Sequence, residues 1–355
     1  MHPRALVIAM AAVSLALAGI ASAAGFKDVL DTPALPSPLA EKSLLNAVAV
    51  GGKRVVCVGR RGIVVYSDDE GKSWRQASVP VSSDLTAVCF VSAKKGWAVG
   101  HDGVVLRTED GGATWAKQMD GRDVARIMGT FYAQKGSKPV AGVDATALKG
   151  MIDRIVAEGP DKPFLEVWFE NETTGFIVGA FNLIFRTSDG GKSWEPWYDR
   201  TENPTFLHLY AIRPIGGELF IAGEQGLVLK LDGKTGTFRS MKVPYNGSFF
   251  GIAGTGKAVV VFGLRGNVYR STDRGKSWKK VEAGVSGVLT GGAVTPEGRL
   301  VLVGQAGDVI ASSDEGASFQ PAGTQLTFPV TGVAALGRGK VALAGFVGTR
   351  VLELK

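Results

Sequence analysis

The amino-acid sequence predicts an all-β protein, a seven-bladed β-propeller with a small helical insertion between blades 2 and 3. Three observations lead to this prediction. An eight-residue turn motif recurs along the chain, strands that end in a small residue and glycine recur with similar spacing, and one longer interval lacks both features. A period of about 40 residues, with about four short strands in each repeat, is typical of propellers.

The turn motif is Ser/Thr-x-Asp-x-Gly-x-Ser/Thr-aromatic, known as the Asp-box or bacterial neuraminidase repeat. Its aspartate can accept backbone hydrogen bonds, its glycine permits positive φ, and its aromatic ring packs at the start of the next strand. The aspartates are Asp69, Asp110, Asp189, Asp273 and Asp314, followed by Trp74, Trp115, Trp194, Trp278 and Phe319. A worn copy lies at residues 231–238. We interpret the boxes as folding devices rather than as sites.

The number of blades follows from the glycines that end each second strand. They are Gly59, Gly100, Gly179, Gly223, Gly263, Gly304 and Gly345. Successive glycines lie 40 to 44 residues apart, except for one interval of 79 residues. That interval contains residues 121–163, where Asp144 can cap a helix with apolar residues at helical spacing up to residue 156. We therefore predict seven blades and a helical insertion over 121–163.

The two ends of the chain carry separate predictions. Residues 1–23 have a basic Arg4, an apolar run and an Ala21-Ser22-Ala23 cleavage site, which indicates a secretory signal peptide. Residues 24–355 would then form one exported propeller without a transmembrane anchor. The seventh repeat stops after its third strand, so we expect the segment around 26–35 to add the outer strand that closes this blade.

Composition narrows the classes of partner. The 355-residue chain has a formal charge of +7, which favours an anionic membrane surface, an acidic protein patch or a polyanion. Nucleic acid is excluded as the partner of an exported protein. Cys57 and Cys89 could be buried small hydrophobic residues, or could form a disulfide between adjacent blades. No residues have metal-ligand spacing, so neither a metal nor a cofactor is expected.

Propeller topology places the turns between second and third strands on one face, around the mouth of the central channel. The basic residues in these turns form a candidate contact surface for a partner: Arg60, Arg61 and Arg265. Three further arginines precede the Asp-boxes: Arg107, Arg186 and Arg270. They either add to this surface or are solvated strand residues whose aliphatic side-chain carbons cover the sheet.

An alternative function is a sialidase-like glycoside hydrolase or a glycan-binding propeller. A hydrolase needs two carboxylates that face each other across the sugar, and Asp102 and Glu224 could lie at the channel mouth. Hairpin-turn carboxylates are also ordinary turn residues. The Arg-Ile-Pro element of sialidases is absent.

Three runs of the chain carry a family resemblance: Gly96 to Trp115, Val167 to Trp194, and Gly263 to Trp278. Each combines a Gly-aromatic or Gly-terminated strand with an Asp-box shortly after it. On these residues the chain resembles the photosystem II stability/assembly factor family. The resemblance implies a non-enzymatic scaffold that binds the exported or lumenal part of a membrane complex through an arginine-rich face, in the periplasm or in the thylakoid lumen of a photosynthetic organism. Apart from the resemblance, we expect a monomer, and an accessory role beside a membrane transporter stays open.

Overall fold

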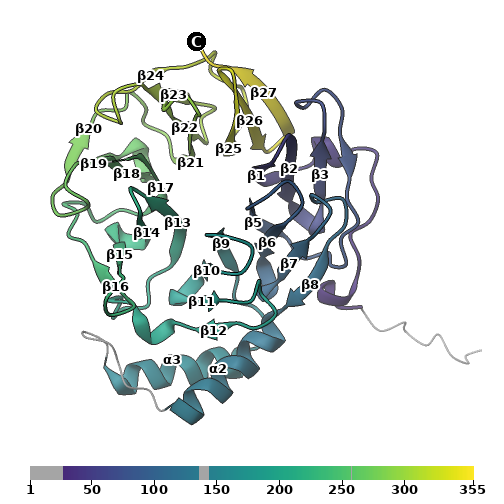
Figure 1. The fold of residues 1–355 in the computed structure, drawn as a ribbon, viewed down its shortest axis with the longest axis vertical. Coiled ribbons are helices and arrows are strands. Elements are labelled where there is room, and N and C mark those ends of the chain that lie inside the picture. Colours follow the sequence, from purple (N-terminus) through teal and green to yellow (C-terminus); the bar gives the residue numbers. More distant parts are fainter. Residues whose placement is uncertain (1–26, 136–143, 257) are drawn as a thin grey trace, which may run out of the picture.

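The computed structural model describes residues 27–135, 144–256 and 258–355. The described strands form seven antiparallel sheets, six with four strands and one with three. The sheets stand around a central axis as the blades of a propeller (Figure 1). The predicted fold class is confirmed. The predicted signal peptide lies outside the described residues.

The strands of blades 1 and 2 are β1 (Leu45–Gly51), β2 (Arg54–Gly59), β3 (Val64–Ser67), β4 (Arg75–Gln76), β5 (Leu85–Phe90), β6 (Gly96–Gly100), β7 (Val105–Thr108) and β8 (Ala116–Met119). Those of blades 3 and 4 are β9 (Phe164–Phe169), β10 (Gly175–Gly179), β11 (Ile184–Thr187), β12 (Glu195–Pro196), β13 (Leu209–Ile215), β14 (Glu218–Gly223), β15 (Val228–Asp232) and β16 (Thr237–Ser240). Those of blades 5 to 7 are β17 (Phe249–Thr255), β18 (Ala258–Gly263), β19 (Val268–Ser271), β20 (Lys279–Val281), β21 (Leu289–Val294), β22 (Leu300–Gly304), β23 (Val309–Ser312), β24 (Gln320–Pro321), β25 (Val330–Gly337), β26 (Lys340–Gly345) and β27 (Gly348–Glu353).

The hydrophobic core lies between adjacent blades. The second strand of each blade is covered on both faces, so it is a continuous apolar run rather than an alternating one. In β2, Val55, Val56, Cys57 and Val58 are all fully buried. The resulting clusters are shared by neighbouring blades, which makes the stability of each blade depend on the next one.

The Asp-boxes form the turns between third and fourth strands. In blade 5, Asp273 accepts hydrogen bonds from the Ser271 hydroxyl and from the backbone N–H and hydroxyl of Ser277. These bonds, with that from the Ser277 hydroxyl as the largest cause, hold the pKa of Asp273 well below its usual range. The Trp278 indole donates to the Gly275 carbonyl at 3.1 Å. The box is therefore fully engaged in its own turn.

The N-terminal segment does not close blade 7, so this expectation was wrong. Residues 27–39 run outside blade 1, where the Ala34 N–H donates to the Val79 carbonyl at 3.1 Å. Blade 7 consists of β25, β26 and β27 among the described residues. The ring is closed instead by packing of β25 against β1, with a hydrogen bond from the Thr331 hydroxyl to the Leu45 carbonyl at 2.7 Å.

Side-chain burial explains the path of this segment. Leu30 is 1% exposed and packs with Val79 and Val104 in the cluster between blades 1 and 2. Three prolines follow at positions 33, 36 and 38 and cannot donate hydrogen bonds to a sheet ladder. A buried leucine anchor and a proline-rich stretch favour an irregular strap over an outer strand.

The predicted helical insertion is confirmed, although it contains two helices where the sequence indicated one. They are α2 (Gly121–Lys135) and α3 (Ala145–Glu158), and Asp144 caps α3 by accepting from the Ala147 N–H at 2.9 Å. Both helices lie outside the ring, beside blade 3 (Figure 1). Their apolar faces belong to the hydrophobic core of blades 2 and 3, so the insertion covers and stabilises the outer side of these blades.

Candidate binding face at the channel mouth

The turns between second and third strands surround one mouth of the channel. In five blades the second turn residue has left-handed φ, between 51° and 57°. These residues are Arg61, Asp102, Phe181, Gln225 and Arg265. This conformation is unfavourable for any residue with a Cβ, by about 1–2 kcal/mol. The ring therefore presents five defined side chains at the mouth at some cost in stability, which is common at functional surfaces.

The structure does not gather the candidate arginines into one patch. Asp84 accepts from the Arg60 guanidinium at 3.3 Å and from the Arg61 N–H at 2.8 Å. This fixes the blade 1 turn, with both arginine side chains exposed. Arg265 is also exposed but belongs to blade 5, on the other side of the channel (Figure 1).

Two large apolar side chains adjoin the blade 1 arginines around the ring. Phe346 and Val347 form the corresponding turn of blade 7, the neighbour of blade 1, and are 48% and 54% exposed. Exposed apolar residues near arginines are the composition that protein interfaces favour.

The arginines that precede the Asp-boxes lie at the opposite ends of the blades. Arg107 forms an ion pair with Glu109 at 2.7 Å, and Arg270 donates to the Glu315 carbonyl at 2.8 Å. Arg186 lies over the Trp197 ring. They do not add to the mouth surface, because a third strand that starts at the mouth ends at the Asp-box side. Instead, their stems cover the sheets.

A second ring of side chains lies just inside the mouth. Each innermost strand has a β-bulge at its second residue, which re-aims that side chain. The seven bulge residues are Asn46, Thr86, Leu165, Tyr210, Phe250, Thr290 and Thr331. In blades 1, 2, 6 and 7 the bulge residue is polar and donates to a carbonyl of the next blade, at 2.6–2.7 Å. In blades 3, 4 and 5 it is apolar or aromatic.

The bulge residues of blades 4 and 5 belong to a continuous aromatic track, defined here as Phe181, His208, Tyr210 and Phe250. Ring centroids along it lie 4.7, 6.1 and 5.1 Å apart. All four side chains are half-buried. Desolvation raises the pKa of Tyr210, and the nearby charge of Glu224 adds to this effect.

The aromatic track borders a shallow cavity of about 290 Å³ at the mouth. Its walls are Leu165, Tyr210, Phe250, Leu264, Val288, Thr290 and Gln305. Arg265 directly follows Leu264 and is exposed in the same turn, so we expect its positive charge to lie near this surface. The arrangement suits a segment that carries apolar side chains and an acidic group.

Comparison with known proteins identifies the family. The family model described as photosynthesis system II assembly factor YCF48 matches residues 67–128 and 154–322, more than half of the chain. The chain belongs to this family.

A curated relative carries the same family name. The photosystem II assembly lipoprotein Ycf48 of Synechococcus sp. (strain CC9902) is 32% identical over 120 residues, which cover 32% of this chain and 35% of that protein. The match thus spans about a third of the relative's length. No helix in the described ranges is long and apolar enough to span a membrane.

Solved structures show the same fold at low identity. YCF48 bound to D1 peptide has a TM-score of 0.63 at 15% identity, covering 91% of this chain and 99% of that one. YCF48 from Cyanidioschyzon merolae has a TM-score of 0.62 at 13% identity, covering 89% and 96%. The WD40 propeller domain of Doa1 has the same TM-score at 12% identity, covering 91% and 95%.

Within this YCF48-type propeller, the carboxylates of the alternative hydrolase lie in the turns of two blades that are not neighbours. Asp102 belongs to the turn of blade 2 and Glu224 to that of blade 4. Glu224 accepts from the His208 backbone N–H at 3.2 Å, which gives this carboxylate a local structural role.

The two cysteines do not form a disulfide, which answers the question the sequence left open. Cys57 packs toward blade 7, whereas Cys89 packs toward blade 3, so their side chains leave blades 1 and 2 in opposite directions. Burial raises the pKa of the Cys57 thiol above its ordinary value and that of Cys89 to about 12.

Both thiols are therefore expected to react slowly in the folded protein, because Cys57 is buried and the raised pKa of the half-buried Cys89 disfavours its thiolate. Treatment of the unreduced native protein with a thiol-specific chromogenic reagent should release almost no colour. The same unreduced protein in denaturant should titrate two thiols. A count of zero in denaturant would show a disulfide and contradict the geometry.

Proposed function

We propose that the protein is a non-catalytic, exported assembly scaffold that binds an extramembrane segment of a membrane-complex subunit at the channel mouth. The single observation that carries the proposal is the aromatic track at the channel mouth, in a chain of the YCF48 family. The family's solved member bound to a D1 peptide supports a polypeptide ligand. The signal-like residues 1–23 support export to a periplasm or thylakoid lumen.

The mechanism is docking onto a preformed surface. Aromatic and arginine residues supply most of the energy at protein interfaces, and half-buried rings lose little side-chain entropy on binding. The apolar cavity would receive one or two apolar side chains of the partner, and Arg265 or Arg61 would pair with an acidic residue. The rigid ring lets the scaffold hold an extended segment without rearranging.

The proposal is tested by fluorescence anisotropy with labelled peptides that tile the D1 sequence. At least one peptide should bind, and Phe250→Ala and Arg265→Glu should each weaken it by about 10-fold or more, the loss expected at an interface hot spot. Lys276→Glu is the matched control, because Lys276 is exposed on the Asp-box of the same blade. Circular dichroism melts verify that each variant is folded.

Two results would contradict the proposal: no binding by any tiled peptide, or equal weakening by all three variants, which would indicate a general charge or folding effect. Turnover of fluorogenic glycosides that is lost in Asp102→Asn would instead favour the glycan-active alternative. The engagement of Glu224 in its own turn does not favour that outcome.

A further inference from the structure

The innermost strands of the seven blades line the channel, so residues at the same position in each strand can be compared from blade to blade. Their third residues are Ala47, Ala87, Glu166, Ala211, Gly251, Gly291 and Gly332. Their fifth residues are Ala49, Cys89, Trp168, Arg213, Ala253, Ala293 and Ala334. Small residues occupy almost every blade at both levels. Glu166 and Trp168 in blade 3 and Arg213 in blade 4 are the large or charged exceptions.

Close approach of the innermost strands explains the small residues. A Cβ at Gly291 would lie 3.2 Å from the Gly332 Cα, and one at Gly332 would lie 3.3 Å from the Ala47 Cα. Between blades 3 and 4, an ion pair of 2.7 Å joins Arg213 to Glu166 instead. Such a pair seldom stabilises a fold more than the apolar contacts it replaces. The other blades show that the ring does not need this pair for closure.

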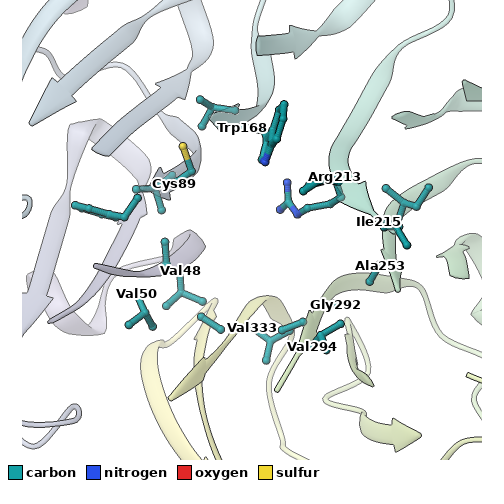
Figure 2. Close-up of a pocket in the computed structure, with 18 of the residues that line it drawn as sticks. Val48, Val50, Cys89, Trp168, Arg213, Ile215, Ala253, Gly292, Val294 and Val333 are labelled. Atoms are coloured by element: carbon teal, nitrogen blue, oxygen red, sulfur yellow. The ribbon is translucent and has the colours of Figure 1, made fainter. Parts of the chain in front are cut away.

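Arg213 lies in the wall of a channel cavity of about 570 Å³, a size typical of small-molecule sites. The cavity lies toward the ends of the innermost strands, on the Asp-box side and away from the aromatic track. Of the described residues that line it, Arg213 alone is charged. Figure 2 shows its guanidinium directed into the space between the strands, near Trp168. The rest of the wall is apolar and mostly aliphatic, with Cys89 and Phe90 from blade 2.

Contacts within the protein orient the Arg213 guanidinium but engage only some of its hydrogen-bond donors. It contacts the Glu166 carboxylate and donates to the Ile212 carbonyl at 2.7 Å, which engages two of the five donors an arginine has. Glu166 is 9% exposed and also accepts from the Val167 N–H at 3.0 Å. The Arg213 side chain is 40% exposed. Glu166 thus orients the arginine, and the remaining N–H groups are available on the cavity side.

We propose that this cavity binds a small organic monocarboxylate with an apolar body. The carboxylate would accept two hydrogen bonds from the free side of Arg213, the geometry that guanidinium favours. The Trp168 ring and the aliphatic wall would cover the apolar body. A monoanion fits better than a phosphate dianion, because Glu166 already offsets the charge of Arg213. This site is separate from the peptide face and binds without any peptide present.

The test is calorimetric titration of the full propeller with 4-phenylbutyrate, 4-phenylbutan-1-ol and 4-phenylbutylamine, which share one apolar body. The carboxylate should bind at least about 10-fold more tightly than the alcohol, the loss expected when a charged hydrogen-bonded pair is removed. The amine should not bind. Quenching of tryptophan fluorescence by the carboxylate, reduced in Trp168→Leu, provides a second readout.

The double variant Arg213→Met/Glu166→Gln removes the ion pair without stranding a buried charge. It should bind the carboxylate and the alcohol equally weakly. Arg350→Met is the matched control, because Arg350 is exposed on the outer strand of blade 7, and it should bind as the parent does. The proposal is overturned by equal binding of acid and alcohol to the parent, by unchanged carboxylate affinity in the double variant, or by no binding up to about 10 mM, the weak limit for so small a ligand.

Discussion

Trp97→Ala is expected to lower the free energy of unfolding by about 3–5 kcal/mol, the range for removing a large aromatic side chain from a core. Trp97 is fully buried between blades 2 and 3 and stacks on Phe169, with ring centroids 3.6 Å apart. Its indole N–H donates to the Gly190 carbonyl at 3.3 Å, which ties the Asp-box of blade 3 to blade 2. Truncation leaves a cavity and removes this link between blades.

Chemical denaturation followed by circular dichroism measures the change. Trp74→Ala is the control, because Trp74 is only half-buried and its indole N–H donates to the Gly71 carbonyl of its own Asp-box rather than to a neighbouring blade. The control should lose less stability, in proportion to the apolar area that it buries. A loss in Trp97→Ala no larger than that of Trp74→Ala would show that packing between blades 2 and 3 is not what stabilises this part of the ring.

Leu30→Ala is expected to cost about 2–5 kcal/mol, although Leu30 lies in an irregular strap near the start of the described chain. Its side chain is 1% exposed within the cluster shared by blades 1 and 2. The strap is also held by the Arg122 guanidinium, which contacts the Asp31 carboxylate at 3.0 Å. Loss of the Leu30 side chain should release this segment from blades 1 and 2 and expose the apolar cluster between them to water.

Leu35→Ala is the matched control, since Leu35 is 77% exposed in the same strap and should change stability by no more than about 0.5 kcal/mol. Hydrogen exchange locates the effect. Leu30→Ala should deprotect the amides of Ala34 and Ser82, which bond across the strap, and leave those of β26 protected. Faster exchange confined to blade 7 would instead restore the idea that this segment closes that blade.

The regular features of the ring could be predicted from residues alone because each has a local cause. The Asp-box needs only its own eight residues, as the bonds within the box at Asp273 show. The small-Gly strand ends and the cap at Asp144 are equally local. Helix α2 was not predicted as a separate helix, although Asp120 and Asp123 cap its start: Asp120 accepts from the Arg122 N–H, and Asp123 accepts from the Asp120 N–H. Its apolar face is recognised only from its packing in the core of blades 2 and 3.

The candidate site was only partly accessible to the same reasoning. The mouth turns were located correctly, so Arg61 and Arg265 lie on the expected face. The track at Tyr210 and Phe250 was missed, because a β-bulge decides where those side chains point. Alignment of the seven innermost strands could have found it, since these positions hold Asn or Thr in four blades.

By itself, the sequence determined the number of blades, the turns and the order of strands, because turn chemistry and apolar patterning act over a few neighbouring residues. Tertiary structure alone decided the path of the Leu30 strap, the separation of Cys57 from Cys89 and the pairing of Arg213 with Glu166. Each of these depends on which side of a blade a side chain leaves and on what the next blade offers there. Contacts between blades join residues that are distant in the chain, so no local pattern encodes them.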